Sequence, residues 1–194
     1  MTGTLHKDST RKMLYLPGFA SCGDSNKTRL LKSFFGQSAI MAPDLPVAPD
    51  SAATFIEKLL KRPSFSGLIG SSLGGFYATL FSELFRIPAV LINPSVHPDR
   101  TLAPYVGSNR FWCSGEAFEW KREYLDQLRA MKSGGGRCST MKLVLLQTAD
   151  EVLDYRIAEA AYSGCEIVVE PGGNHRFENL QEYLGLIEDF FNRL

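Results

Sequence analysis

The stretch GLIGSSLGGFYATLF, residues 67–81, decides the fold of this chain. An apolar run, Gly67–Ile69, leads into Gly70-Ser71-Ser72-Leu73-Gly74, and a helical apolar pattern follows at once. G-x-S-x-G between a strand and a helix is typical of a sharp, strained turn that lifts a serine hydroxyl clear of the edge of a sheet. Side chains two positions before and after that serine would collide in the turn, so both positions must be small.

The glycines also indicate which serine is the nucleophile. Ser72 has Gly70 and Gly74 two positions away, whereas Ser71 has an isoleucine and a leucine there, which are too bulky. A dinucleotide-binding G-x-G-x-x-G would need glycine in place of Ser72, so that interpretation fails. A glycine-rich turn that only reverses the chain is the remaining non-catalytic alternative.

Other short apolar runs, bounded by turn residues, are typical of strands buried on both faces of a parallel sheet. They are Met13–Leu16, Ser38–Met41, Ala89–Ile92, Lys142–Leu146 and Glu166–Val169. Helical patterns lie between most of them, the clearest being Ser51–Leu60, Gly75–Phe85 and Glu178–Leu194. This alternation predicts one α/β domain over residues 1–194, with a mostly parallel, doubly wound sheet and helices on both faces.

The alternation stops between Ser95 and Ser139. The aromatic residues gathered there are Tyr105, Phe111, Trp112, Phe118, Trp120 and Tyr124. The segment YLDQLRAM, residues 124–131, is its clearest helix, and the flexible sequence SGGGR follows. We expect a small helical cap insertion at about residues 95–139, whose aromatic content suggests an apolar pocket.

A serine hydroxyl becomes a good nucleophile only when a base takes its proton. The chain has three histidines. His6 is in the polar N-terminal tail, and His97 lies in a loop between two prolines. His175 lies in a glycine-rich loop that follows a strand and precedes the last helix, which is where the base falls in the chain order Ser…Asp/Glu…His.

The acid of this order should follow the preceding strand, and Asp150 does so. The chain between Asp150 and His175 has room for one helix, near Leu153–Tyr162, and one strand. Both residues would then project from the C-terminal edge of the sheet, where ligands bind in open α/β sheets. Glu151 and Asp154 are the competing carboxylates. We expect both at the start of the helix, where carboxylates stabilise its N-terminal dipole.

The loop LPGFASCG, residues 16–23, has two glycines spaced somewhat like those of a phosphate-binding loop. Asp24 stands where such a loop needs its lysine, so a nucleotide site is disfavoured. We expect instead that the backbone N–H groups of Phe19 and Leu73 form an oxyanion hole, with Gly18 leaving the approach to the substrate open.

The bulk composition excludes several classes of function. Lys+Arg and Asp+Glu both number 21, so no basic excess indicates nucleic acid or an anionic membrane as a partner. The polar N-terminus and the absence of a long apolar run predict a cytoplasmic protein without a membrane span. The cysteines lack metal-ligand spacing and are expected to be free thiols; they are Cys22, Cys113, Cys138 and Cys165. No metal or cofactor is expected.

Five blocks of the chain carry a family resemblance: LYLPGF, IGSSLGGFYAT, AVLINPSV, LLQTADEVLDYR and EPGGNHRFENLQEY. In this order and spacing, over nearly the whole chain, they resemble the small bacterial YqiA-type esterases of the α/β-hydrolase superfamily. The resemblance implies an α/β-hydrolase fold, catalytic positions at Ser72, Asp150 and His175, and hydrolysis of short-chain carboxylic esters, with thioesters as further substrates. Many α/β-hydrolases carry His-Gly where this chain has Pro17-Gly18.

The sequence therefore predicts a serine esterase that acts through an acyl-enzyme on Ser72 and binds a small-molecule acyl ester or thioester. An amidase or peptidase of the same fold is the first alternative, because the leaving group is selected by cap residues that the sequence does not position. A non-catalytic binding protein is the second alternative, although such a protein has no need of a strained turn. The physiological substrate and the oligomeric state do not follow from the sequence.

Overall fold

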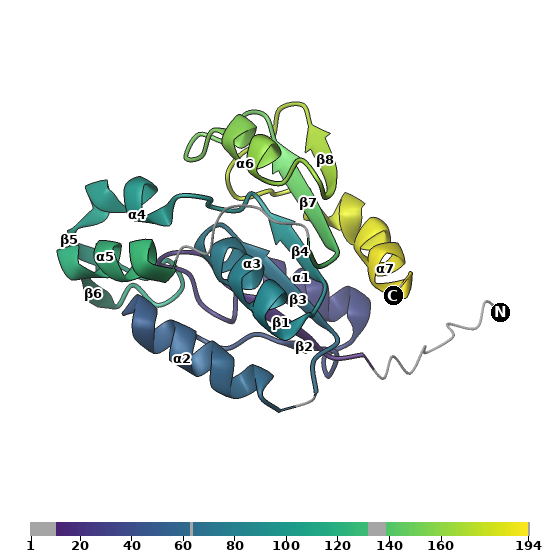
Figure 1. Cartoon of the computed structure of the whole chain (residues 1–194), viewed down its shortest axis with the longest axis horizontal. Coiled ribbons are helices and arrows are strands. Elements are labelled where there is room, and N and C mark those ends of the chain that lie inside the picture. The colour runs from purple at the N-terminus through teal and green to yellow at the C-terminus, as the bar shows by residue number, and fades with distance from the viewer. Residues whose placement is uncertain (1–10, 63, 132–138, 194) are drawn as a thin grey trace.

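The computed structural model of the chain describes residues 11–62, 64–131 and 139–193 (Figure 1). Three features discussed above lie outside these residues: His6, the SGGGR segment and Cys138. Within the described ranges, none of the helices is long and apolar enough to cross a membrane.

A six-stranded sheet with the order β2-β1-β3-β4-β7-β8 forms the centre of the molecule, and all of its strand pairs are parallel. Its strands are β1 Met13–Leu16, β2 Ile40–Met41, β3 Gly67–Ser71, β4 Ala89–Ile92, β7 Lys142–Gln147 and β8 Glu166–Glu170. The chain leaves β1 towards β2 on one side and leaves β3 towards β4 on the other. The carboxyl ends of β1 and β3 therefore flank a topological switch point, where ligands bind in open α/β sheets.

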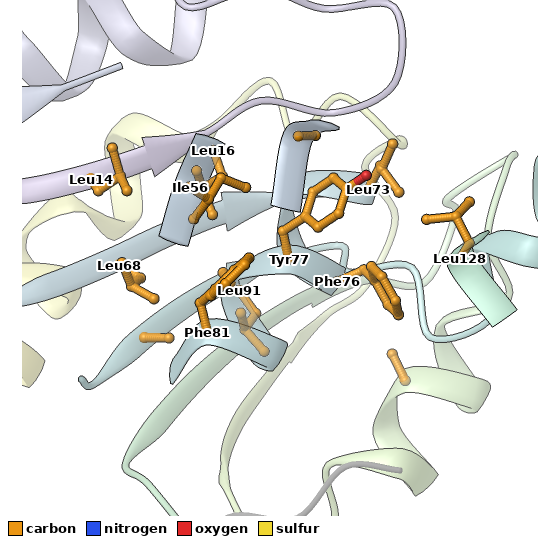
Figure 2. Packing of buried hydrophobic residues seen from close by; sticks show 14 of the residues in the cluster. Leu14, Leu16, Ile56, Leu68, Leu73, Phe76, Tyr77, Phe81, Leu91 and Leu128 are labelled. Carbon is orange, nitrogen blue, oxygen red and sulfur yellow. The ribbon is translucent and has the colours of Figure 1, made fainter. Parts of the chain in front are cut away.

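Two apolar clusters cover the two faces of the sheet, because successive side chains of a strand point to opposite faces. One cluster joins Leu14, Leu68 and Leu91 to helices α2 (Pro49–Leu60) and α3 (Leu73–Phe85). Figure 2 shows this cluster from Leu68 through Tyr77 of α3 to Leu128 of helix α5 (Arg122–Met131). The other cluster packs the opposite face against α1 (Asn26–Phe35) and α7 (Leu184–Asn192). The predicted doubly wound α/β sheet, with helices on both faces, is confirmed.

The structure adds details to the predicted elements. Helix α1 was not predicted; the Ser25 side chain caps it by accepting the Thr28 N–H. The predicted C-terminal helix is divided into a 3₁₀ turn, η2 (Leu180–Tyr183), and α7. Its apolar stripe packs on the sheet as expected, since Leu180, Leu184, Ile187, Phe190 and Phe191 are all buried.

The segment between β4 and β7 lies beside the sheet edge and contains short helices and a β-hairpin (Figure 1). Below, the name cap stands for this segment, and cap hairpin for residues 107–120 within it. Its elements are α4 Pro98–Thr101, η1 Ala103–Tyr105, β5 Gly107–Arg110, β6 Ala117–Trp120 and α5 Arg122–Met131. Helix α5 includes the predicted YLDQLRAM helix. The antiparallel β5–β6 pair was not predicted, because the polar sequence of β5, GSNR, has no apolar alternation.

Candidate active site

The turn between β3 and α3 gives Ser72 a backbone conformation that few residues adopt. Its φ is 55° and its ψ is −120°, and conformations of this kind cost about 1–3 kcal/mol. Two backbone hydrogen bonds join the turn to the neighbouring strand and its loop: the Ser72 N–H donates to the Ile92 carbonyl at 3.0 Å, and the Ser72 carbonyl accepts the Ser95 N–H at 3.0 Å. The strained serine is therefore tied to β4 and to the loop that follows it.

The glycines on either side of Ser72 lie in contacts that leave no room for a side chain. A Cβ atom at position 70 would lie 2.3 Å from the Gly74 carbonyl oxygen. At position 74 it would lie 1.9 Å from the Leu16 carbonyl oxygen, at the end of β1. The turn therefore packs against itself and against the neighbouring strand, which is why α3 can begin directly after the serine.

Ser72, His175 and Asp150 form one hydrogen-bonded chain, although they are far apart in the sequence. The Ser72 Oγ lies 3.0 Å from His175 Nε2, and His175 Nδ1 lies 2.8 Å from Asp150 Oδ2. The His175 side chain is 18% exposed and that of Asp150 is 2% exposed. The imidazole thus reaches the serine from a loop after β8, with a buried carboxylate behind it.

The surroundings of the three nearby carboxylates give them different roles. The second oxygen of Asp150, Oδ1, accepts the backbone N–H groups of Val152 and Leu153, both at 2.8 Å, which fixes the orientation of the carboxylate. Asp154 caps helix α6 (Tyr155–Ala161), as its predicted place at the helix start requires.

The prediction for Glu151 was wrong. Glu151 precedes helix α6 in the loop, and its Oε2 accepts the His175 backbone N–H at 2.9 Å. This hydrogen bond is the main reason that the pKa of the Glu151 carboxyl lies below its ordinary value. Sequence position alone could not reveal this contact, because the loop after β8 supplies the donor.

Two backbone N–H groups are available near the Ser72 hydroxyl. Gly18 packs against the serine so closely that a Cβ there would lie 3.1 Å from Ser72 Cβ. Phe19 follows it, and Leu73 is the first residue of α3. In the described part of the chain, the N–H groups of Phe19 and Leu73 donate no hydrogen bond to another protein group. Neither N–H group is therefore taken up by another group of the described protein.

Two small cavities share Leu73 in their walls. One is about 20 Å³ and is lined by Ser72, by Thr101 at the end of α4 and by Val152 and Leu153 after Asp150. The other is about 30 Å³ and has an apolar, largely aromatic wall. That wall comes from the loop after β1, from α3 and from the cap hairpin, and it includes Phe19, Tyr77, Phe111, Phe118 and Trp120.

The loop after β1 is joined to the cap hairpin in three ways. The Phe19 ring contacts those of Trp120 and Phe118, with ring centres 5.0 and 5.7 Å apart. The Trp112 N–H donates to the Ala20 carbonyl at 2.9 Å. A disulfide joins Cys22 to Cys113, across a sequence separation of 91 residues.

The expectation of free thiols was therefore wrong. Among the residues that the structure describes, no cysteine is free. Cys22 and Cys113 come together only because the hairpin folds back over the loop. Their separation in the sequence gives no sign of that approach.

The sequence interpretation also missed buried amide side chains behind His175. Asn93 follows β4 and Gln147 ends β7, and their exposed fractions are 2% and 1%. Both hydrogen-bond to the backbone beside the histidine. The sequence did offer one sign of these residues. Each is a polar residue at the carboxyl end of an otherwise apolar buried strand, at the edge of the sheet where ligands bind.

A family model matches residues 12–192 of this chain, and its description is "Uncharacterised protein family (UPF0227)". The chain belongs to this family. Among its UPF0227 relatives, a protein from Serratia proteamaculans is 27% identical over 191 residues, covering 92% of this chain and 97% of the relative. A protein from Vibrio parahaemolyticus is also 27% identical, over 126 residues, and that match spans only 64% of each chain. The resemblance to YqiA-type proteins of the α/β-hydrolase superfamily is confirmed.

Solved structures of low sequence identity share the fold. Est1E from Butyrivibrio proteoclasticus, solved with ferulic acid bound, has a TM-score of 0.73 at 13% identity, covering 99% of this chain and 94% of that one. A putative hydrolase from Agrobacterium vitis has a TM-score of 0.74 at 16% identity, with 93% and 88% covered. A monoacylglycerol lipase from Paleococcus ferrophilus has a TM-score of 0.68 at 13% identity, with 94% of each chain covered. These likenesses establish the α/β-hydrolase fold.

Proposed function

We propose that this protein is a serine hydrolase that cleaves carboxylic esters through an acyl-enzyme on Ser72. The observation that carries the proposal is the hydrogen-bonded chain from the Ser72 hydroxyl through His175 to the buried Asp150 carboxylate. A strained serine between a strand and a helix, with an imidazole and a carboxylate behind it, is the arrangement that activates serine in this fold.

The chemistry follows from the geometry. His175 Nε2 takes the proton of Ser72 Oγ as that oxygen bonds to the acyl carbon, and the bond to the leaving-group oxygen breaks as His175 returns the proton to it. Water then repeats the sequence and releases the acid. Asp150 keeps the Nδ1 proton of His175 in place and stabilises the imidazolium. General acid–base help of this kind contributes about 10²–10⁴-fold to the rate.

The tetrahedral intermediate carries a negative oxygen that needs fixed donors. The N–H groups of Phe19 and Leu73 would supply them, since both flank the serine and donate to no other group in the described part of the protein. Each such donor is worth about 10²–10³ in kcat.

The cavity beside Phe19 supports a small-molecule substrate with an apolar acyl group. Its wall, which includes Phe19 and Trp120, is largely aromatic and suits such a group. Thioesters would fit the same chemistry, because the carbonyl carbon and the oxyanion are common to both classes. Structural neighbours that include an esterase domain from Rhodothermus marinus and the monoacylglycerol lipase from Paleococcus ferrophilus are consistent with this class of reaction.

Hydrolysis of p-nitrophenyl acetate and butyrate tests the proposal, together with labelling by a fluorophosphonate probe. We expect both reactions in the purified protein and neither in Ser72→Ala, with Ser71→Ala as the matched control that keeps most of the activity. The matching p-nitroanilide measures amidase activity in the same assay. A folded protein that neither hydrolyses these esters nor reacts with the probe would be a binding protein, and the proposal would be wrong.

A further inference from the structure

Three amide side chains lie behind the loop that carries His175, two of them buried and one half-buried. The histidine loop comprises residues 171–177, between β8 and η2. The amide network comprises Asn93, Gln147 and Asn179, together with the Glu170 carboxylate that ends β8. Asn93 and Gln147 hydrogen-bond to the backbone of the loop, and Gln147 joins Asn179 and Glu170 to them. In the described part of the chain, the hydrogen bonds of the His175 ring go to Ser72 and Asp150.

Both the nitrogen and the oxygen of the Asn93 side-chain amide form hydrogen bonds. Its Nδ2 donates to the carbonyl oxygens of Asn174 and His175, at 3.1 and 3.3 Å. Its Oδ1 accepts the Gln147 backbone N–H at 3.0 Å. Asn93 has a φ of 40°, a left-handed conformation that asparagine tolerates better than most residues. The residue therefore joins the ends of β4 and β7 to the backbone of the catalytic histidine.

Gln147 holds the loop from the other side. Its Oε1 accepts the Asn174 N–H at 2.8 Å, while its Nε2 donates to Asn179 at 2.6 Å and to Glu170 at 3.0 Å. Gly173 packs directly on this side chain. A Cβ atom added at position 173 would lie only 2.1 Å from Gln147 Cδ. The loop backbone thus fits against the amide without space between them.

The last member of the network is the charged carboxylate of Glu170. The Glu170 carboxylate accepts Nδ2 of Asn179 at 2.7 Å as well as Gln147. Hydrogen bonds from Tyr183, Gln147 and Asn179 hold the pKa of the Glu170 carboxyl below its ordinary value. Buried amides with every partner in place rigidify a structure, whereas an apolar replacement leaves the loop's donors and acceptors unpaired.

We propose that Asn93 and Gln147 are positioning residues, which hold the backbone at Asn174 and His175 so that the imidazole lies within hydrogen-bonding distance of the Ser72 hydroxyl. The inference rests on the proposed function, since it assigns these amides to the activation of Ser72. Misplacing a catalytic group by about 1 Å costs on the order of 10²-fold in rate. The amides should therefore affect the chemical step rather than substrate binding.

The test compares Gln147→Met and Asn93→Asp with Ser82→Ala. Gln147→Met keeps the length of the side chain without its hydrogen bonds, and Asn93→Asp loses the donor to the two loop carbonyls. Ser82 is the matched control, because it is fully buried and hydrogen-bonded to the Ile87 carbonyl but belongs to the far end of α3. The measurements are thermal unfolding, kcat and KM on p-nitrophenyl acetate, and the rate of fluorophosphonate labelling.

We expect both network variants to lower kcat and the labelling rate by about 10- to 100-fold, with KM within about twofold of wild type. Ser82→Ala should lower the melting temperature and leave kcat within about twofold. In a His175→Ala background, Gln147→Met should have no further effect on labelling, whereas a purely structural contribution would add to that of His175→Ala. Folded network variants with wild-type kcat would overturn the proposal.

A measurement that needs no activity separates this inference from the proposed function. The proton between His175 Nδ1 and Asp150 should give a low-field NMR resonance in the wild type and in Ser82→Ala. We expect it to weaken or disappear in Gln147→Met and Asn93→Asp. If it is unchanged in both, the amides do not position the histidine, whatever reaction the protein performs. If the wild type neither hydrolyses nor labels but the resonance responds, the proposed function fails and the positioning role stands.

Discussion

The edge of the sheet and the cap both line the candidate active site, but they are built differently. At the edge, Gly70 and Gly74 lie in backbone contacts that admit no added atom, and Asn93 and Gln147 are almost completely buried. In the cap hairpin most residues are exposed, and Trp112 is 78% exposed. The edge thus holds Ser72 and the histidine loop through packed backbone and buried amides, whereas the hairpin supplies part of the wall of a cavity and is tied to the loop after β1.

The difference separates two kinds of constraint. Groups that exchange a proton must stay within a few tenths of an ångström of each other, so they are held by packed backbone and saturated hydrogen bonds. A wall that contacts an apolar substrate tolerates larger changes. Adding or removing one methylene group there alters the discrimination between substrates by only about 1–3 kcal/mol. Mutations at the edge should therefore abolish activity or folding, and mutations in the cap should alter preference.

The largest effect is expected for Asp150→Asn. The amide oxygen can still accept the N–H groups of Val152 and Leu153, so the fold is retained. The histidine, however, loses the acceptor that fixes its tautomer, and kcat should fall by about 10⁴-fold. Asp154→Asn, at the cap of α6, is the control and should leave the rate of p-nitrophenyl acetate hydrolysis within about twofold. Equal losses in both variants would contradict the assignment of the acid.

The next effect concerns folding. Gly74→Ala places a Cβ 1.9 Å from a backbone carbonyl oxygen, which no rotamer change can relieve, and should cost more than about 4 kcal/mol. Gly115→Ala lies in the hairpin, where φ is 71° but nothing lies within 4 Å of the added atom, and should cost only about 1–2 kcal/mol. Urea unfolding measures both free energies. Similar costs at the two sites would remove the contrast between the edge and the cap.

A smaller effect is expected in the wall of the cavity. Phe118→Ala enlarges the cavity beside Phe19, and we expect the rate ratio of p-nitrophenyl hexanoate to acetate to rise about tenfold. Trp112→Ala, in the same hairpin but outside the cavity wall, should leave the ratio unchanged. A Phe118→Ala variant that loses all activity would show that the hairpin also holds the reacting groups.

The smallest effect is a pH dependence of stability. Because hydrogen bonds lower the pKa of the folded Glu170 carboxyl, its carboxylate stabilises the fold above the ordinary glutamate pKa of about 4.3. That contribution is lost as the pH falls through the lowered pKa that the Glu170 carboxyl has in the folded protein. Glu170→Gln should therefore be less stable than wild type at pH 7, and the difference should shrink towards pH 3. Glu119→Gln, exposed in β6, is the control, and its unfolding free energy should follow the wild type at every pH.

Much of the fold could be predicted from local patterns. Six apolar runs indicated the strands of the sheet, and polar turns separated them, because a strand buried on both faces must be apolar throughout. The hairpin was missed for the opposite reason. Its residues are largely exposed, so nothing in their pattern distinguishes them from a loop.

For the candidate site, the sequence predicted the small residues around Ser72 and the chain order of Ser72, Asp150 and His175. The structure brings these three side chains into one hydrogen-bonded chain. The role of Glu151 was misjudged, because its partner is a backbone N–H from a distant loop. Asn93 and Gln147 were overlooked, since an amide gives no sign in the sequence of which backbone groups it will bind.

The sequence by itself determined the parallel sheet and the strained serine turn, because both follow from local sterics and from the period of apolar residues. Only the tertiary structure decided which carboxylate faces the imidazole, which cysteines join and which amides hold the histidine loop. These contacts join residues far apart in the chain. Their partners are set by the register of the strands and the packing of the loops, which no local pattern encodes.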